Sequence, residues 1–123
     1  MLQHASLEVP EALVPDCVAF WELLGFTRMA APPRLGGRFT WVERQGTQIH
    51  LIRCDDPSTP ARESHVAVVA DDYDRALAAL ADAGFHAEEG SDAWDAPRSF
   101  VRDPAGHLVE VMARPPLPPF PEA

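Results

Sequence analysis

The chain repeats itself at an interval of about 60 residues, and this repeat limits the available folds more than any other feature. Element order and landmark residues both recur in the second half. The corresponding landmarks are His4 and His65, Gly25-Phe26 and Gly84-Phe85, Arg38 and Arg98, Gly46 and Gly106, and His50 and Glu110. Each half alone is too small to bury a hydrophobic core, so the two halves must pack together.

Hydrophobic periodicity assigns the elements of the first half. A strand over 3–9 ends before Pro10, which cannot donate a hydrogen bond to a neighbouring strand. A helix follows over 14–24, and a short strand opens at Phe26. Two further strands, 38–44 and 47–53, flank Gln45-Gly46, a plausible two-residue hairpin turn.

The same order returns in the second half. A strand over 65–70 precedes a helix from Tyr73 to Gly84, and a short strand begins at Phe85. Strands over 99–102 and 107–113 form a last hairpin. The pattern predicts an α+β fold of two βαβββ modules, with eight strands and the helices on one face. Within a single domain of 1–123, the expected parts are module 1–54, linker 55–63, module 64–114 and a proline-rich tail 115–123.

Composition excludes several classes of protein. The formal net charge of -9 argues against nucleic acid as a partner. No apolar run approaches the ~20 residues that a membrane span needs. No signal peptide is visible, which favours a cytoplasmic protein. Cys17 and Cys54 lack metal-knuckle spacing and are interpreted as reduced thiols.

Four polar residues are expected on one face of the strands. Side chains alternate across a strand, so aliphatic neighbours packed under the helices leave the intervening residues on the opposite face. The residues placed there are His4, His50, His65 and Glu110. Three imidazoles and one carboxylate are suitable ligands for divalent Zn, Ni, Mn, Fe or Co, so the sequence predicts a metal site. The other histidines, His86 and His107, lie beside turns and are interpreted as solvated.

Apolar and aromatic side chains are expected around this site. The Gln45-Gly46 turn places Trp41 opposite His50 and Phe39 opposite Ile52. Leu108 and Met112 share a face with Glu110, and Trp94 is a candidate lid. The expected substrate-binding residues are therefore Phe39, Trp41, Ile52, Trp94, Leu108 and Met112. These residues equally suit a second core or a dimer contact. Arg98 is interpreted as an ordinary surface arginine.

Several of these segments resemble the vicinal oxygen chelate superfamily, which includes glyoxalase I, bleomycin-resistance proteins and extradiol dioxygenases. Residues 4–10 (HASLEVP) are similar to the opening strand of the family. Residues 20–26 (FWELLGF) resemble the end of its first helix, and 65–74 (HVAVVADDYD) the start of its second module. Residues 100–110 (FVRDPAGHLVE) resemble its closing hairpin. The resemblance implies a curved, mixed eight-stranded sheet with helices on the convex face.

The resemblance also implies metal ligands on the first and last strands of each module, which are His4, His50, His65 and Glu110. Glyoxalase I sites usually carry two carboxylates, and His50 replaces one of them here. In relatives a ligand carboxylate can act as a base, and Glu110 is the candidate for this catalytic role. The expected reaction is proton transfer next to a carbonyl in a small oxygenated substrate, as in lyases and isomerases.

Two other functions stay open at this point. An iron-dependent extradiol-type dioxygenase would use two histidines and a carboxylate. A metal-free drug- or metabolite-binding protein of the bleomycin-resistance kind would use the aromatic residues as stacking surfaces. A homodimer is expected for each function, because eight strands leave exposed sheet edges.

Overall fold

The computed structural model describes residues 1–122, which divide into two compact units. The first unit contains residues 1–60 and 103–107, and the second contains 61–102 and the chain from Leu108 onward. The elements are β1 (His4–Val9), η1 (Glu11–Leu13), α1 (Val14–Leu23), β2 (Thr27–Met29), η2 (Pro33–Leu35), β3 (Phe39–Arg44), β4 (Thr47–Arg53), β5 (His65–Val69), α2 (Tyr73–Asp82), β6 (Ala87–Glu89), β7 (Arg98–Arg102) and β8 (Leu108–Met112).

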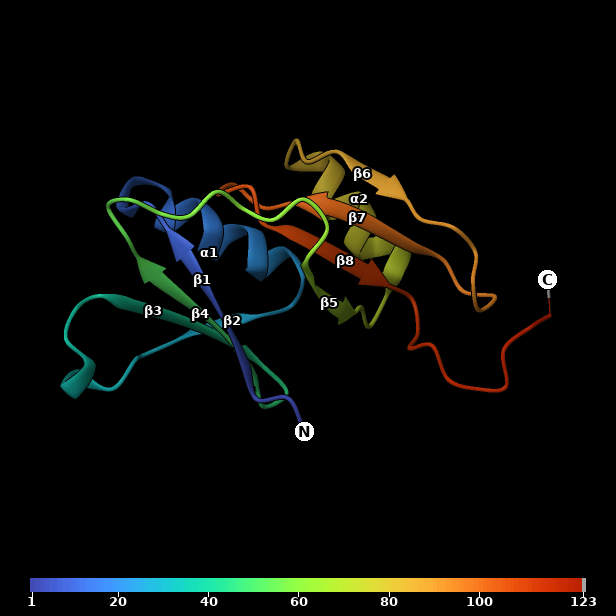
Figure 1. The fold of residues 1–123 in the computed structure, drawn as a ribbon, viewed down its shortest axis with the longest axis horizontal. Helices are drawn as coiled ribbons and strands as arrows, with labels where there is room; N and C mark the ends of the chain where they lie inside the picture. The colour runs from blue at the N-terminus through green and yellow to red at the C-terminus, as the bar shows by residue number, and fades with distance from the viewer. Residues whose placement is uncertain (123) are drawn as a thin grey trace. The chain divides into compact units, whose positions relative to one another are not determined.

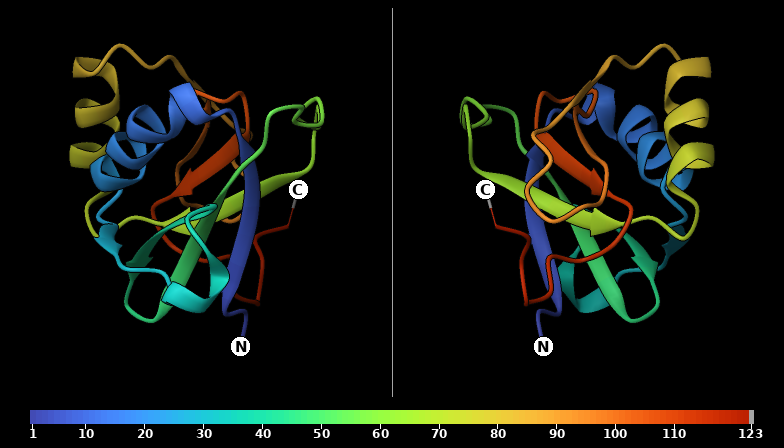
Figure 2. Two further views of the ribbon diagram at one scale, coloured as in Figure 1. Left: turned by 90° about the vertical axis from the view of Figure 1, so that its left-hand side faces the viewer. Right: turned by 90° about the vertical axis from the view of Figure 1, so that its right-hand side faces the viewer.

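The first unit is a four-stranded mixed sheet in the order β1-β4-β3-β2, with α1 to one side of its strands (Figures 1 and 2). β1 runs parallel to β4, and the other neighbours are antiparallel. Phe20 and Trp21 of α1 are fully buried, as are Val42 and Leu51 of the sheet. The sheet face with Val42 and Leu51 therefore lies in the core, and His4 and His50 lie on the opposite face.

Two glycines control the chain direction in this unit. Gly25 follows α1 with φ +89°, a left-handed conformation that ends a helix at little cost only in glycine. In the β3–β4 turn, Gln45 and Gly46 both have positive φ, at 51° and 85°. This is the conformation of the two-residue turn that matches strand twist. The register that it produces pairs Trp41 with His50.

The second unit repeats the arrangement in the order β5-β8-β7-β6, with α2 to one side of its strands (Figure 2). The Asp72 side chain caps α2 by accepting a 3.1 Å hydrogen bond from the Arg75 backbone N–H. Leu80 of α2 is fully buried. The Tyr73 hydroxyl lies 2.6 Å from Ser99 Oγ, which joins the start of α2 to β7.

The turn between β7 and β8 belongs to the first unit. Asp103 Oδ1 accepts hydrogen bonds from the backbone N–H groups of Ala105 (3.0 Å) and His107 (2.8 Å). His107 Nε2 donates to the backbone carbonyl of Glu8 at 2.8 Å. The interpretation of His107 as a solvated side chain is therefore wrong, because its ring anchors this turn to β1. His86 is solvated as expected, with 84% of its side chain exposed.

Burial shifts two ionisable groups near this turn. It raises the pKa of the Asp103 carboxyl, against the lowering effect of the hydrogen bonds from the turn. Burial also raises the pKa of the Cys17 thiol to about 12, and the charge of Asp103 adds to this shift. Cys17 and Cys54 are both free thiols.

The predicted fold class is confirmed: the structure is α+β with two βαβββ modules, and its eight strands form two sheets of four. One detail of the repeat differs by a residue. Arg98 lies opposite Met112, whereas Phe39 lies opposite Ile52, so Phe39 and not Arg38 is the counterpart of Arg98. The shift arises because the β7–β8 turn is longer than the β3–β4 turn.

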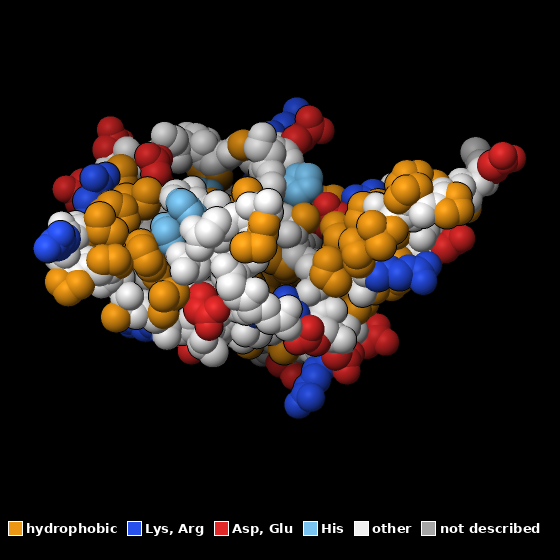
Figure 3. Space-filling view, turned by 90° about the horizontal axis from the view of Figure 1, so that it is seen from below, with side chains coloured by type: hydrophobic (Ala, Val, Ile, Leu, Met, Phe, Trp, Pro, Cys, Tyr) orange, Lys and Arg blue, Asp and Glu red, His pale blue; other side chains and the backbone are white. Residues whose placement is uncertain are grey.

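The proline-rich tail expected at 115–123 contains no helix or strand over 115–122, and Ala123 lies outside the described residues. Figure 3 shows apolar side chains along this C-terminal arm. Leu117 and Phe120 of the arm are 70% and 53% exposed. Within residues 1–122, no helix is long and apolar enough to cross a membrane.

Candidate functional site

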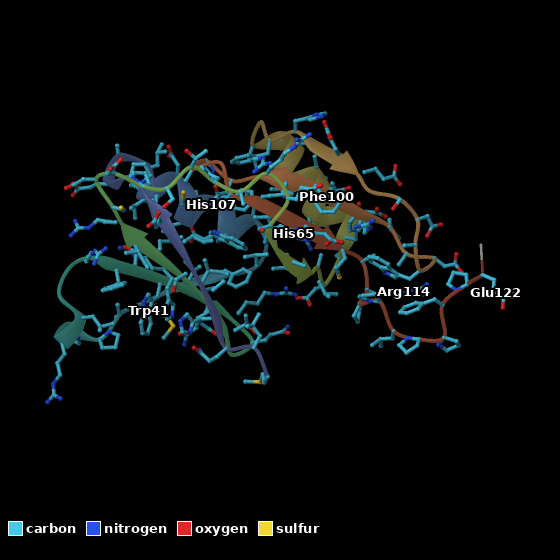
Figure 4. The ribbon with its side chains drawn as sticks, in the orientation of Figure 1. Trp41, His65, Phe100, His107, Arg114 and Glu122 are labelled. Atoms are coloured by element: carbon cyan, nitrogen blue, oxygen red, sulfur yellow. The ribbon has the colours of Figure 1, made fainter. Side chains whose placement is uncertain are left out.

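His65 and Glu110 are the two expected metal ligands that lie in the second unit. His65 begins β5, Glu110 lies in the middle of β8, and the two strands run parallel. His65 Nε2 lies 3.1 Å from Glu110 Oε1. Glu110 is only 5% exposed. The rings of His65 and Phe100, which Figure 4 labels, meet edge to face with their centres 5.4 Å apart.

A hydrogen bond from one ring nitrogen of His65 determines the protonation of the other, which faces the Glu110 carboxylate. Its Nδ1–H donates to the backbone carbonyl of Glu63 at 2.7 Å. In the neutral imidazole, Nε2 then carries a lone pair and points toward Glu110. A lone pair and a carboxylate oxygen repel each other at 3.1 Å unless a proton or a cation lies between them. A proton or a metal cation between His65 Nε2 and Glu110 Oε1 would remove this repulsion.

Arg98 completes the surroundings of Glu110. Its Nη1 donates to Glu110 Oε2 at 3.3 Å, and its side chain is only 17% exposed. The guanidinium carbon lies 5.0 Å from the centre of the Trp94 ring and 5.2 Å from that of Phe100. The interpretation of Arg98 as a surface arginine is therefore wrong, because two aromatic rings and a carboxylate enclose it.

The first unit carries the other two expected ligands, His4 and His50, in a stack of three rings. The His50 ring lies 3.9 Å from the Trp41 ring and 4.0 Å from the His4 ring, and all three are nearly parallel. His50 Nε2–H donates to Gln48 Oε1 at 2.7 Å, which leaves Nδ1 as its lone-pair nitrogen. His4 Nδ1–H donates to Gln3 Oε1 at 2.6 Å, which leaves Nε2.

Burial lowers the pKa of His50 below its ordinary value, and the nearby His4 lowers it further. A lowered pKa keeps the imidazole neutral near pH 7, which is the form that binds metal ions. His50 is therefore chemically suited to bind a metal ion. Its ring is nevertheless stacked between Trp41 and His4, and its Nε2–H is hydrogen-bonded to Gln48.

The four expected ligands thus occur as two pairs, His4 with His50 and His65 with Glu110. Within each pair the side chains are close together, and each pair lies inside one unit. Among residues 1–122, no three histidine, cysteine, aspartate or glutamate side chains come together in a group that could hold a metal ion.

A pocket of about 750 Å³ lies in the second unit beside His65. Phe85, Phe100 and Leu108 provide its apolar wall, and Arg62, Glu63, Glu88 and Arg102 are among its charged lining residues. Its volume is in the range of small-molecule sites. Of the six residues expected to contact substrate, Leu108 is the one that lines this pocket.

The other expected contact residues have different surroundings. Phe39, Trp41 and Ile52 lie on the His50 face of the first sheet, in the predicted register. Met112 is buried opposite Arg98. Trp94 donates from Nε1 to the Arg114 carbonyl at 3.1 Å and lines a second pocket with the tail, of about 580 Å³.

Phe100 is the functional candidate that the sequence reasoning missed. It lies directly opposite Glu110, as Trp41 lies opposite His50, and it contacts both His65 and Arg98. The two-residue turn between β3 and β4 allowed the pairing of Trp41 with His50 to be predicted from the sequence. The longer Asp103–His107 turn does not fix the pairing of Phe100 with Glu110 in this way. The repeat, however, would have indicated Phe100 as the counterpart of Trp41.

Known structures share this fold. A protein from Bacillus anthracis assigned to the glyoxalase family has a TM-score of 0.81 at 24% identity, with 91% of this chain and 93% of that chain covered. A glyoxalase/dioxygenase from Nostoc punctiforme has a TM-score of 0.71 at 16% identity, covering 94% and 91%. Lactoylglutathione lyase from Agrobacterium tumefaciens has a TM-score of 0.65 at 18% identity, with 91% of this chain and 92% of that chain covered.

A search of curated proteins found no match to this chain. The sequence profile of the Glyoxalase/Bleomycin resistance protein/Dioxygenase superfamily matches residues 7–111. That range includes both modules, from within β1 to within β8, and three of the four expected ligands. The protein therefore belongs to the Glyoxalase/Bleomycin resistance protein/Dioxygenase superfamily.

Proposed function

We propose that the protein is a divalent-metal-dependent enzyme that moves a proton next to a carbonyl in a small oxygenated substrate, as lyases and isomerases of this superfamily do. In this proposal His4, His50, His65 and Glu110 bind the metal, and Glu110 is also the catalytic base. The observation that carries the proposal is the contact of His65 Nε2 with Glu110 Oε1.

The separation of these two atoms fits a shared metal ion. Metal–nitrogen and metal–oxygen bonds in zinc sites are each about 2.1 Å long, so two such ligands lie about 3.4 Å apart in a tetrahedral site and about 3.0 Å apart at the right angle of a six-coordinate ion. The observed distance is 3.1 Å. The hydrogen bond from His65 Nδ1 to the Glu63 carbonyl is the kind of outer contact that orients a metal-binding imidazole.

The residues around Glu110 suit a proton acceptor. A divalent metal bound here would act as a Lewis acid and would stabilise negative charge that develops on substrate oxygen atoms. Glu110 takes the proton from the substrate carbon and returns it to a neighbouring atom. Its burial at 5% exposure excludes water, and Arg98 stabilises the carboxylate between turnovers. The adjacent pocket, with Phe85, Phe100 and Leu108, receives the apolar part of the substrate.

The first experiment is elemental analysis of the purified protein beside two variants, His65→Ala and His86→Ala. We expect about one divalent metal per chain in the wild type and a clear loss in His65→Ala. His86→Ala is the matched control, because this histidine belongs to the same unit and 84% of its side chain is exposed.

Reconstitution with Zn, Ni, Mn, Fe and Co identifies the metal that the site prefers. If the wild type binds none of them, or if His65→Ala retains a full equivalent, the metal site is wrong. Iron together with oxygen uptake would instead favour the dioxygenase reaction. If Glu110→Gln keeps full turnover with a substrate found by screening, Glu110 is not the base.

A metal-free binding protein is the second candidate, and the Arg98–Glu110 ion pair favours it. Arg98 Nη1 lies 3.3 Å from Glu110 Oε2 and already compensates the buried carboxylate without a metal. In that case the pocket beside Phe100 binds a ligand in protein stripped of metal. Calorimetric titration of chelator-treated protein with candidate ligands separates the two functions.

Either function would operate in a homodimer. β1 and β2 are the edges of the first sheet, and β5 and β6 are the edges of the second. Exposed edges favour association with another strand, including one from a second copy of the chain. Light scattering of the purified protein gives the mass that tests this expectation.

A further inference from the structure

We propose that Arg98 is a positioning residue that holds the Glu110 carboxylate and the loop 90–97 in one arrangement. The proposal deepens the proposed function and rests on it only where Glu110 serves as a metal ligand. Three features of the second unit support it: the hydrogen bonds of the guanidinium, the rings on either side of it, and the close approach of Gly90.

The guanidinium divides its hydrogen bonds between the loop and the carboxylate. Nε donates to the Ser91 carbonyl at 3.1 Å, and Nη2 donates to Ser91 Oγ at 2.9 Å. Nη1 donates to Glu110 Oε2 at 3.3 Å. The planar fork of an arginine can serve two partners in fixed directions, whereas a lysine ammonium presents one flexible point charge.

Aromatic rings restrict the guanidinium further. Trp94 from the loop lies 5.0 Å from its central carbon, and Phe100 from β7 lies at 5.2 Å. Both distances allow cation–π attraction. Trp94 itself is held by the bond from its Nε1 to the Arg114 carbonyl. The loop, the guanidinium and the carboxylate are therefore connected in one chain of contacts.

Gly90 shows how closely the loop approaches Arg98. A Cβ atom at this position would lie 3.2 Å from Arg98 Cγ and Cζ and 3.0 Å from Phe100 Cε2. Its backbone N–H donates to the Arg98 carbonyl at 2.9 Å. A substitution at Gly90 therefore displaces the guanidinium without removing it, which provides a second way to disturb the arrangement.

The test compares zinc affinity by chelator competition in the wild type and four variants. Groups that orient metal ligands typically change metal affinity about 10–100-fold when they are removed. We expect a loss in this range for both Arg98→Met and Arg98→Lys, because lysine keeps the charge but not the fork. Gly90→Ala should lose about 3–10-fold on the same grounds. Arg75→Met, on the exposed side of α2, is the charge-matched control and should stay within about twofold.

The lysine variant decides what Arg98 does. Wild-type affinity in Arg98→Lys would show that charge alone suffices and would overturn the positioning role. Wild-type affinity in Arg98→Met would overturn any role for Arg98 in the metal site.

Hydrogen exchange of the metal-free protein separates this proposal from the proposed function. The Asp95 backbone N–H in this loop donates to Asp92 Oδ1 at 2.9 Å. Exchange of the Gly90 and Asp95 amides should be at least about tenfold faster in Arg98→Met than in Arg75→Met. If the wild type binds no metal, the proposed function fails, and the exchange result alone decides the role of Arg98. Unchanged exchange in Arg98→Met would overturn the link between Arg98 and the loop.

Discussion

The two modules place different chemistry at equivalent positions of the same backbone. Trp41 lies opposite His50 in the first sheet, and Phe100 lies opposite Glu110 in the second. Around His50 the partners are two aromatic rings and an amide, and burial lowers the pKa of its imidazole. Around Glu110 they are a histidine and an arginine.

In the proposed metal site, the two modules would have different roles. The module with His4 and His50 would supply imidazole nitrogen donors. The module with His65 and Glu110 would supply the negative charge and, in Arg98, the group that orients the carboxylate. The second module should therefore contribute more to metal affinity and all of the proton transfer.

The largest expected effect is on metal affinity. Glu110→Gln should weaken zinc binding by about 100-fold or more, because the only anionic ligand is lost. His50→Gln should weaken it about tenfold, because this ring is one neutral donor and must leave Gln48 or use Nδ1. Chelator competition gives both values. Equal losses would contradict the unequal division between modules.

Stability should respond differently to alanine in the two hairpin turns. Gly46 and Gly106 both have positive φ, at 85° and 91°, so alanine is strained at each. A Cβ at Gly46 meets nothing within 4 Å, whereas at Gly106 it would lie 3.3 Å from Pro60 Cγ. We expect Gly46→Ala to reduce the free energy of unfolding by about 1 kcal/mol and Gly106→Ala by about 2 kcal/mol. Urea unfolding measures both, and a larger loss for Gly46→Ala would refute the steric argument.

The stacked ring pair of the first module should be coupled more strongly than the edge-to-face ring pair of the second. The Trp41 and His50 rings lie parallel at 3.9 Å, whereas the Phe100 and His65 rings meet edge to face at 5.4 Å. A double-mutant cycle with leucine should give about 1 kcal/mol for Trp41–His50 and about half of that for Phe100–His65. The reverse order would show that the stack contributes little to stability.

The smallest expected effect is a pH dependence in the Asp103–His107 turn. Burial raises the pKa of Asp103 above its ordinary 3.8, so its contribution to stability is fully present below that pH and is lost as the pH rises through the raised value. Asp103→Asn cannot ionise, and its amide oxygen can still accept the bonds from Ala105 and His107. The variant should therefore gain stability relative to the wild type as the pH rises from 4 toward 7. Parallel curves for the two proteins would contradict the raised pKa.

Short-range rules were sufficient to predict the elements and the strand faces of the candidate site residues. Strand alternation predicted the faces of His50 and Glu110, and the two-residue turn predicted the partners of Trp41 and Phe39. Each of these inferences depends only on neighbours along the chain or across one tight hairpin, where geometry allows few choices.

Long-range contacts account for what the sequence could not predict. Arg98 is enclosed by Trp94, Phe100 and Glu110, and an arginine pattern alone gives no sign of such burial. His107 bonds to Glu8, a partner 99 residues away. The assignment of four ligands to one metal also depends on long-range geometry, and it stays a prediction.

The bond between His107 and Glu8 has a consequence for biosynthesis. The first compact unit needs residues 103–107, so it cannot be completed while the ribosome has made only the first module. A nascent chain of 60 residues can pair its strands but lacks the turn that satisfies the Glu8 carbonyl. The contact between His107 and Glu8 can therefore form only after residue 107 has emerged.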